Sequence, residues 1–164
     1  MRTGEYALAK ELHGIDIFDG LSDDSLQQIA RYCSQEIYDA GECCAVEGET
    51  IDRILILNGG KVTINMKVLV ARHTHTVTIA TLTKGNVCAW SALVPPHVLT
   101  ASIKCTEITP MTGIRAADLQ RILEERPMVG YIVMKNLARV MSSRLRESHT
   151  QLVRLIAELI KQGK

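Results

Sequence analysis

The chain has 164 residues, of which 46% are hydrophobic, and this length suits one globular domain with a buried core. Nineteen basic residues stand against eighteen acidic ones, and a net charge of +1 excludes the basic excess typical of nucleic-acid-binding proteins. The sequence has no apolar run of about 18 residues and no signal-peptide pattern, so we expect a soluble cytoplasmic protein.

Two helices are predicted before the first strand. Residues 4–13 form a short amphipathic helix, and Ser22 can cap a second helix that ends before Ser34. Apolar residues at helical spacing predict the buried face of this second helix, namely Leu26, Ile29 and Ala30.

After Gln35 the apolar residues alternate with polar ones, which is typical of strands. The sequence RILILN at 53–58 is a short apolar strand, and the NGG sequence at 58–60 predicts a hairpin turn. Two alternating strands follow, with a turn near Ala71 to His73. Strands at this spacing predict an antiparallel jelly-roll barrel, so the expected fold is mainly β with flanking helices.

The five cysteines are an odd number without CxxC spacing. In a chain with no recognisable export signal, the expected state is a set of reduced thiols buried in the core. These residues are Cys33, Cys43, Cys44, Cys88 and Cys105.

The segment 85–103, GNVCAWSALVPPHVLTASI, is the part of the chain around which the rest is organised, and we call it the cassette. Gly85 marks a turn, residues 90–94 predict one helical turn that two prolines end, and a strand is predicted from Leu99. A single helical turn between strands leaves amide N–H groups that can bind an anion such as phosphate. The alternative is an ordinary tight connection in a barrel.

Several blocks of sequence, in this order, resemble the cyclic-nucleotide-binding domain, which is the sensor module of catabolite-activator-type regulators. The blocks are FDGLSDDSLQQIA, YDAGECCAVEGETIDRILILNGGKVTI, the cassette, and DLQRILEERP followed by a long helix. The resemblance covers roughly residues 15–145. It implies a jelly-roll domain with N-terminal helices at 1–126 and a long C-terminal dimerisation helix at 127–164.

In that family the cassette has a glutamate that binds ribose and an arginine that binds phosphate. Trp90 stands at the glutamate position and Leu99 at the arginine position, so the groups that hold a nucleotide are replaced. The family's long helix contacts the base, which brings in Arg144. The ligand site that the resemblance implies comprises Gly85, Ala89, Trp90, Ser91, Ala92, Leu93, Leu99, Thr100, Ala101 and Arg144.

The resemblance therefore implies a ligand-responsive regulatory module in signal transduction and not an enzyme. We expect it not to bind cAMP or cGMP in the usual way, but to take an unidentified small-molecule effector, a cyclic nucleotide or another small anionic or aromatic ligand. No metal or other cofactor, no direct contact with nucleic acid and no contact with a membrane are expected.

Three alternatives remain open at this point. The chain can be the effector-binding half of a transcription regulator, whose DNA-binding domain would follow Lys164 in a longer gene product or come from another polypeptide. It can be a structural dimer with a vestigial pocket. It can also be a cupin-type metal-dependent enzyme, because His73 and His75 share a face of a strand and histidines bind metals.

The cupin alternative lacks support from the rest of the sequence. No glutamate follows the two histidines at the required short distance, and Lys67 stands where a cupin motif has glycine. Exposed histidines of a hairpin are the favoured interpretation, and His97 is expected at the rim of a pocket. Iron–sulfur regulators of the superfamily have a cysteine cluster near the N-terminus, whereas no cysteine precedes Cys33 here.

After a helix at 116–125, Pro127 marks the start of a much longer helix with apolar residues at nearly heptad spacing. These residues are Met134, Leu137, Met141, Leu145, Ser148, Leu152, Leu155 and Leu159. We expect Met134 to Met141 to pack on the barrel. The second half predicts a homodimer interface formed by Leu145, Leu152, Leu155 and Leu159.

Overall fold

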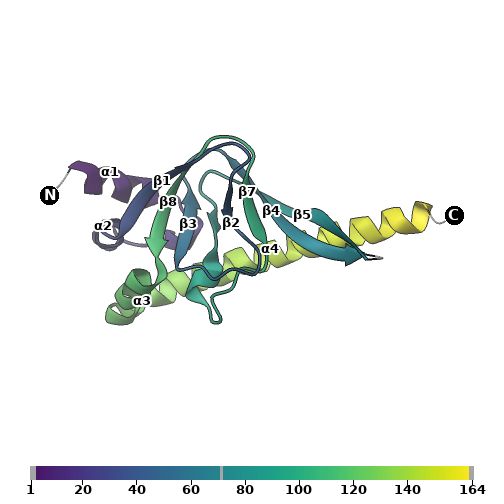
Figure 1. Ribbon diagram of the computed structural model, residues 1–164. Coiled ribbons are helices and arrows are strands. Elements are labelled where there is room, and N and C mark those ends of the chain that lie inside the picture. The colour runs from purple at the N-terminus through teal and green to yellow at the C-terminus, as the bar shows by residue number, and fades with distance from the viewer. Residues whose placement is uncertain (1–2, 71, 163–164) are drawn as a thin grey trace.

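The structure is a computed structural model that describes the backbone of residues 3–70 and 72–162 and the side chains of 8–69, 72–154 and 156–158. Helices flank a β-barrel in it, and one long helix runs beyond the barrel (Figure 1). The elements in chain order are α1(Thr3–Leu12), η1(Asp16–Phe18), α2(Asp23–Ala30), β1(Cys33–Tyr38), β2(Cys43–Ala45), β3(Arg53–Leu57), β4(Lys61–Val70), β5(His73–Thr83), β6(Val87–Cys88), η2(Trp90–Leu93), β7(Ser102–Cys105), β8(Thr109–Arg115), α3(Ala116–Glu125) and α4(Pro127–Gln162).

The strands form two four-stranded antiparallel sheets, with the orders β1-β8-β3-β6 and β2-β7-β4-β5. Strand β3 is apolar from Ile54 to Leu57, and both of its faces are buried over these residues. Ile54 and Ile56 pack with the helices, whereas Leu55 and Leu57 pack between the two sheets. The expected jelly-roll fold with flanking helices is confirmed.

Helix α2 begins as its sequence predicts. The hydroxyl oxygen of Ser22 accepts a hydrogen bond from the backbone N–H of Ser25 at 3.4 Å, which satisfies one of the donors left open at a helix start. The predicted apolar face is buried as well, and it consists of Leu26, Ile29 and Ala30.

The predicted hairpin at residues 58–60 is wrong. Strand β3 pairs with β6 and β8, whereas β4 pairs with β5 and β7, so the turn leads from one sheet to the other. The side-chain amide of Asn58 donates to the hydroxyl of Thr112 at 2.9 Å. At Gly60, with φ +72°, a Cβ atom would lie 2.8 Å from the Cα of Thr109, so the crossing with β8 requires glycine here.

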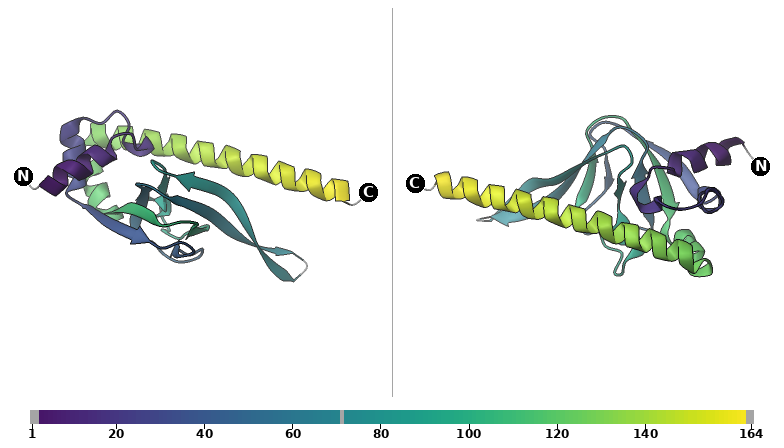
Figure 2. Two further views of the ribbon diagram at one scale, coloured as in Figure 1. Left: turned by 90° about the horizontal axis from the view of Figure 1, so that it is seen from above. Right: turned by 180° about the vertical axis from the view of Figure 1, so that it is seen from behind.

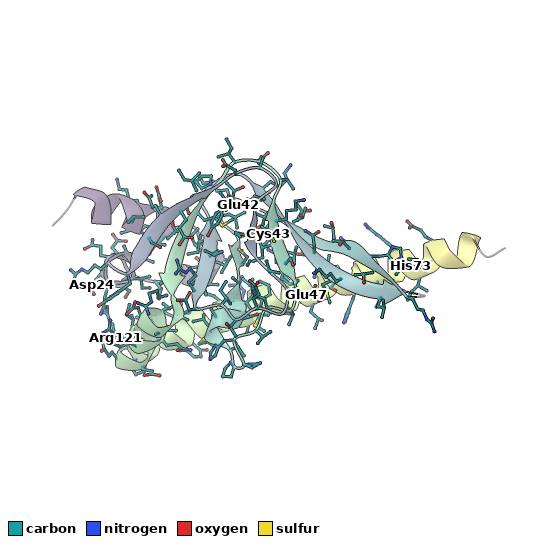
Figure 3. The ribbon with its side chains drawn as sticks, viewed as in Figure 1. Asp24, Glu42, Cys43, Glu47, His73 and Arg121 are labelled. Carbon is teal, nitrogen blue, oxygen red and sulfur yellow. The ribbon has the colours of Figure 1, made fainter. Side chains whose placement is uncertain are left out.

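Two further expectations need correction, namely the residue at which β7 begins and the burial of the cysteines. Strand β7 begins at Ser102 and not at Leu99, because the backbone N–H of Leu99 donates to the carbonyl of Glu49 in a loop instead. All five cysteines are free, yet only Cys88 and Cys105 are buried. Cys43 is exposed on β2, where Figure 3 labels it, so the expectation of uniformly buried thiols is wrong.

Helix α4 lies along one side of the barrel and continues past it, so the two chain ends lie at opposite ends of the molecule (Figure 2). Its inward residues are buried, namely Val129, Val133, Leu137 and Val140. The prediction that Met134 to Met141 pack on the barrel is confirmed for Leu137 but wrong for Met134 and Met141, which are 46% and 40% exposed. Heptad spacing alone does not say which side of the helix the barrel covers.

Candidate functional site

The cassette connects β5 to β7 through a tight bend and a short helix. Gly85 has φ +88° and its N–H donates to the carbonyl of Leu57 at 2.8 Å. Ala89 adopts a left-handed conformation directly before η2, and the N–H of Val94 donates to the carbonyl of Ser91 where η2 ends. Because Ala92 is buried in the core, packing holds η2 in place.

A cavity of about 100 Å³ lies between the cassette and α4. Most of the predicted site residues line it, namely Ala89, Trp90, Ser91, Leu99, Thr100, Ala101 and Arg144. Gly85, Ala92 and Leu93 do not line it: the glycine forms the preceding bend, and the other two are buried in the core. The structure thus brings the predicted residue of α4 together with residues on both sides of the two prolines of the cassette.

Six residues that line the cavity were not predicted from the sequence, namely Ile64, Ile79, Ala80, Cys88, Ile103 and Ser148. Ser148 could have been predicted, because a residue four positions after Arg144 lies on the same side of a helix. The residues on β4 and β5 carried no such signal, since only the pairing of the strands brings them here.

Leu99 is buried in the core between the sheets and presents an apolar side chain to the cavity. Trp90 is half-buried, packs against the core on the helix side and also lines the cavity. Neither side chain can pair with a phosphate, so any charge for a ligand has to come from elsewhere.

Arg144 supplies the charge. Its side chain is 17% exposed, and its Nη1 donates to Oε2 of Glu147 at 2.9 Å. Its Nε is buried and donates to no acceptor within the described residues. Burial raises the pKa of the Cys88 thiol to about 12, Cys105 adds to the rise, and the charge of Arg144 opposes it. Cys88 lines the same cavity as Arg144.

A second cavity, of about 820 Å³, lies on the other side of Leu99. Tyr38 donates a hydrogen bond to Glu36 there, and Arg53 Nη1 lies 3.0 Å from Glu36 Oε1. Burial alone would raise the pKa of Glu36, but hydrogen bonds from Tyr38, Arg53 and Ser34 lower it below its usual value. These groups form hydrogen bonds and an ion pair with one another. The charge of Glu36 is therefore balanced within the protein and needs no ligand.

The histidines lie apart from the cavity beside α4. His97 lines the larger cavity, where its Nδ1 donates to the carbonyl oxygen of Ala92 at 2.9 Å. His73 and His75 are exposed on β5, and Figure 3 places His73 near the tip of the β4–β5 hairpin. Within residues 3–70 and 72–162 no three His, Cys, Asp or Glu side chains group to hold a metal ion. In the same ranges no helix has the length and apolar character to cross a membrane.

No protein-family model matches the chain. The chain is 27% identical over 135 residues to glutaminase 1 of Bradyrhizobium diazoefficiens, which covers 82% of this chain and 21% of the relative. It is 28% identical over 107 residues to the cGMP-dependent protein kinase egl-4 of Caenorhabditis elegans, which covers 65% of this chain and 13% of the relative. The chain thus spans about a fifth or less of the length of these relatives.

Solved structures match over most of the chain. A cyclic nucleotide-binding domain from Methylobacillus flagellatus has a TM-score of 0.81 at 19% identity, over 92% of this chain and 85% of that one. The catabolite activator protein of Thermus thermophilus has a TM-score of 0.70 at 23% identity, over 85% and 62%. The regulatory subunit of a cAMP-independent protein kinase A from Trypanosoma brucei has a TM-score of 0.74 at 15% identity, over 93% and 52%. This chain therefore has the fold of a cyclic-nucleotide-binding domain.

Proposed function

We propose that this chain is a regulatory module that binds a small-molecule effector in the cavity between the cassette and α4. The observation that supports this most directly is the lining of that cavity, in which residues of the cassette lie opposite Arg144 and Ser148 of α4. A ligand there contacts the barrel and the helix together. Its binding energy can then favour one position of α4 over another, which is how a ligand shifts a conformational equilibrium.

Regulation also fits the proteins that share the fold. The similar structures include the regulatory subunit of a protein kinase and a catabolite activator protein, which points to a non-catalytic role. The glutaminase and the kinase among the relatives are several times longer than this chain, so we assign their catalytic activities to other parts of those proteins.

The effector that we propose is not cAMP or cGMP. A cyclic phosphodiester is an anion, and it leaves water only where paired charges or donors replace its hydration. Leu99 provides neither, and the cavity is smaller than the roughly 300 to 1,000 Å³ of typical ligand pockets. The kinase subunit from Trypanosoma brucei is described as cAMP-independent, which supports the view that this fold also serves regulators that do not respond to cAMP.

A second candidate function is the effector-binding part of a longer transcription regulator. The similarity to the catabolite activator protein of Thermus thermophilus, of which this chain covers 62%, favours it. Whether the natural reading frame continues past Lys164 into a DNA-binding domain distinguishes the two. Homodimer formation through α4 and a cytoplasmic location belong to both proposals.

A thermal-stability screen of cyclic mononucleotides and common metabolites tests the proposal. A ligand at 100 times its dissociation constant should stabilise the protein by about 2.7 kcal/mol. The same ligand should change the rate of amide hydrogen exchange in α4 around Arg144. A ligand that raises the melting temperature but leaves exchange in α4 unchanged would contradict the regulatory role, and a screen without any response would favour a vestigial pocket.

A further inference from the structure

Among the residues that the structure describes, Arg144 is the one charged residue that lines the cavity beside α4. The other lining residues are apolar or carry a hydroxyl or a thiol, and Arg144 faces them from the helix. A charge next to apolar walls interacts more strongly with an opposite charge than it would in water, because the local dielectric constant is lower. The cavity thus favours a ligand with negative charge at its α4 side and apolar surface elsewhere.

The hydrogen bonding of Arg144 is incomplete on one edge. Nη1 donates to Glu147, which follows it by three residues on the same helix. Nε is buried without an acceptor, and Nη2 makes no hydrogen bond within the part of the chain that the structure describes. Nε and Nη2 present two parallel N–H donors on one edge of the guanidinium group. A ligand that reached this edge would leave the pair with Glu147 intact.

The shape of the open edge and the size of the cavity limit the ligand. Two parallel N–H donors match the two oxygens of a carboxylate, and the hydroxyls of Ser91 and Thr100 line the same cavity as further donors. A second negative charge, as on inorganic phosphate, would meet no second cation among the described lining residues. The volume of about 100 Å³ is below the ~150 Å³ of an apolar cavity that holds benzene, so the body of the ligand is small.

We propose that Arg144 binds the carboxylate of a small organic acid whose apolar body packs against Leu99 and Ile103. This inference rests on the proposed ligand-binding role of the cavity and names the class of ligand. The cation that the cassette lacks at Leu99 is then supplied by α4, so that occupancy of the cavity acts on the helix directly.

The single tryptophan of the chain, Trp90, lines this cavity and provides a fluorescence signal for binding. We would titrate the protein with isobutyrate, with isobutyramide as a neutral molecule of nearly the same shape, and with inorganic phosphate. Isobutyrate should change the emission in a saturable way and bind at least about tenfold more tightly than isobutyramide, the lower end for a charge-assisted hydrogen bond. Tighter binding of phosphate than of isobutyrate would overturn the carboxylate assignment.

Variants of Arg144 measure its contribution to ligand affinity separately from that of the other cavity residues. Arg144→Gln should lose about tenfold or more in isobutyrate affinity and leave isobutyramide unaffected, and Arg144→Lys, which keeps the charge without the paired donors, should fall between. Arg146→Gln is the matched control, because Arg146 donates to Ser142 and does not line the cavity. Circular dichroism checks that each variant is folded.

The outcomes distinguish this inference from the proposed function. Equal affinities for isobutyrate and isobutyramide, or a loss with Arg146→Gln equal to that with Arg144→Gln, would overturn the role of Arg144 and leave the cavity as a ligand site. No response to isobutyrate would overturn the carboxylate assignment as well. The proposed function fails when the wider screen finds no ligand, or when a ligand that binds leaves amide exchange in α4 unchanged.

Discussion

Trp90 and Leu99 decide what the cavity offers to a nucleotide. We predict that the double variant Trp90→Glu and Leu99→Arg gains cAMP affinity by roughly 10- to 150-fold, since a charge-assisted hydrogen bond contributes about 1.5 to 3 kcal/mol. Replacing the indole ring also frees volume on the cassette side. Isothermal titration calorimetry measures the gain.

The control for this prediction is Leu99→Lys alone, which introduces a charge without the paired donors of arginine. Its gain should be smaller than that of the double variant. If the double variant binds cAMP no better than the original chain, the cavity differs from a nucleotide site in shape as well as in charge.

Glu36 makes stability depend on pH in the acid range. Hydrogen bonds from Tyr38, Arg53 and Ser34 outweigh the effect of burial and lower its pKa in the folded state. The unfolded chain therefore binds a proton more readily, and the stabilisation is present above the unfolded pKa of about 4.3 and lost as pH falls through the lower folded value. The free energy of unfolding should differ more between the original chain and Glu36→Gln at about pH 6 than at about pH 3.

Urea unfolding at both pH values gives these free energies. Glu124→Gln is the control, because Glu124 is exposed on α3 and makes no hydrogen bond or ion pair within the described residues. A difference between Glu36→Gln and the original chain that stays constant with pH would contradict the role of Glu36.

At the scale of elements, the contact of α3 with α4 depends on Gly130. A Cβ atom at this position would lie 2.7 Å from the backbone carbonyl oxygen of Leu123 in α3, so alanine pushes the two helices apart. Alanine favours a helix by about 1 kcal/mol over glycine, whereas overpacking costs about 1 to 3 kcal/mol. We predict that Gly130→Ala lowers the free energy of unfolding by up to about 2 kcal/mol, measured in urea.

Ala138→Gly, at an exposed position of the same helix, measures helix propensity in α4 without the clash. It should cost about 1 kcal/mol. A Gly130→Ala variant as stable as the original chain would show that α4 can shift on α3 at little cost.

Some elements of the fold can be predicted from neighbouring residues in the sequence, whereas others cannot. The cap at Ser22 and the alternation of β4 and β5 act within a few residues, so the sequence predicts them. The turn at 58–60 has the composition of a hairpin, but the partner of β3 is β8, more than fifty residues later in the chain, and the contact of Gly60 with Thr109 arises only from that pairing. Local sequence does not contain that information.

The same distinction applies to the candidate site. The sequence blocks follow the order that they have in the cyclic-nucleotide-binding domain family, and this order was enough to indicate the cassette and Arg144. The structure places both at one cavity. Ile79 and Ala80 reach that cavity because β5 pairs with β4 with a register shift between Ile64 and Asn65. No pattern in the sequence fixes such a register. The open edge of Arg144 also became visible only from its contacts.

For the molecule as a whole, α4 connects the cavity to a surface beyond the barrel. Leu145 and Leu152, which lie next to the cavity-lining Arg144 and one heptad later, are 58% and 56% exposed. The predicted seam also includes Leu155 and Leu159, whose side chains lie outside the described residues. A ligand that moves Arg144 therefore moves a helix whose neighbouring side is apolar, so effector binding and dimer formation would be coupled.

We predict that the chain is a homodimer and that Leu145→Lys with Leu152→Lys makes it a monomer, because each seam position would place a lysine close to its counterpart in a second chain. Sedimentation velocity measures the change in mass. Thr150→Lys with Ala157→Lys is the matched control, since these exposed positions have the same spacing and lie on the opposite side of the helix. A control variant that stays dimeric while the leucine variant becomes monomeric places the interface on the seam. Dimers in both variants would assign association to another surface, and the coupling between cavity and partner chain through α4 would then be lost.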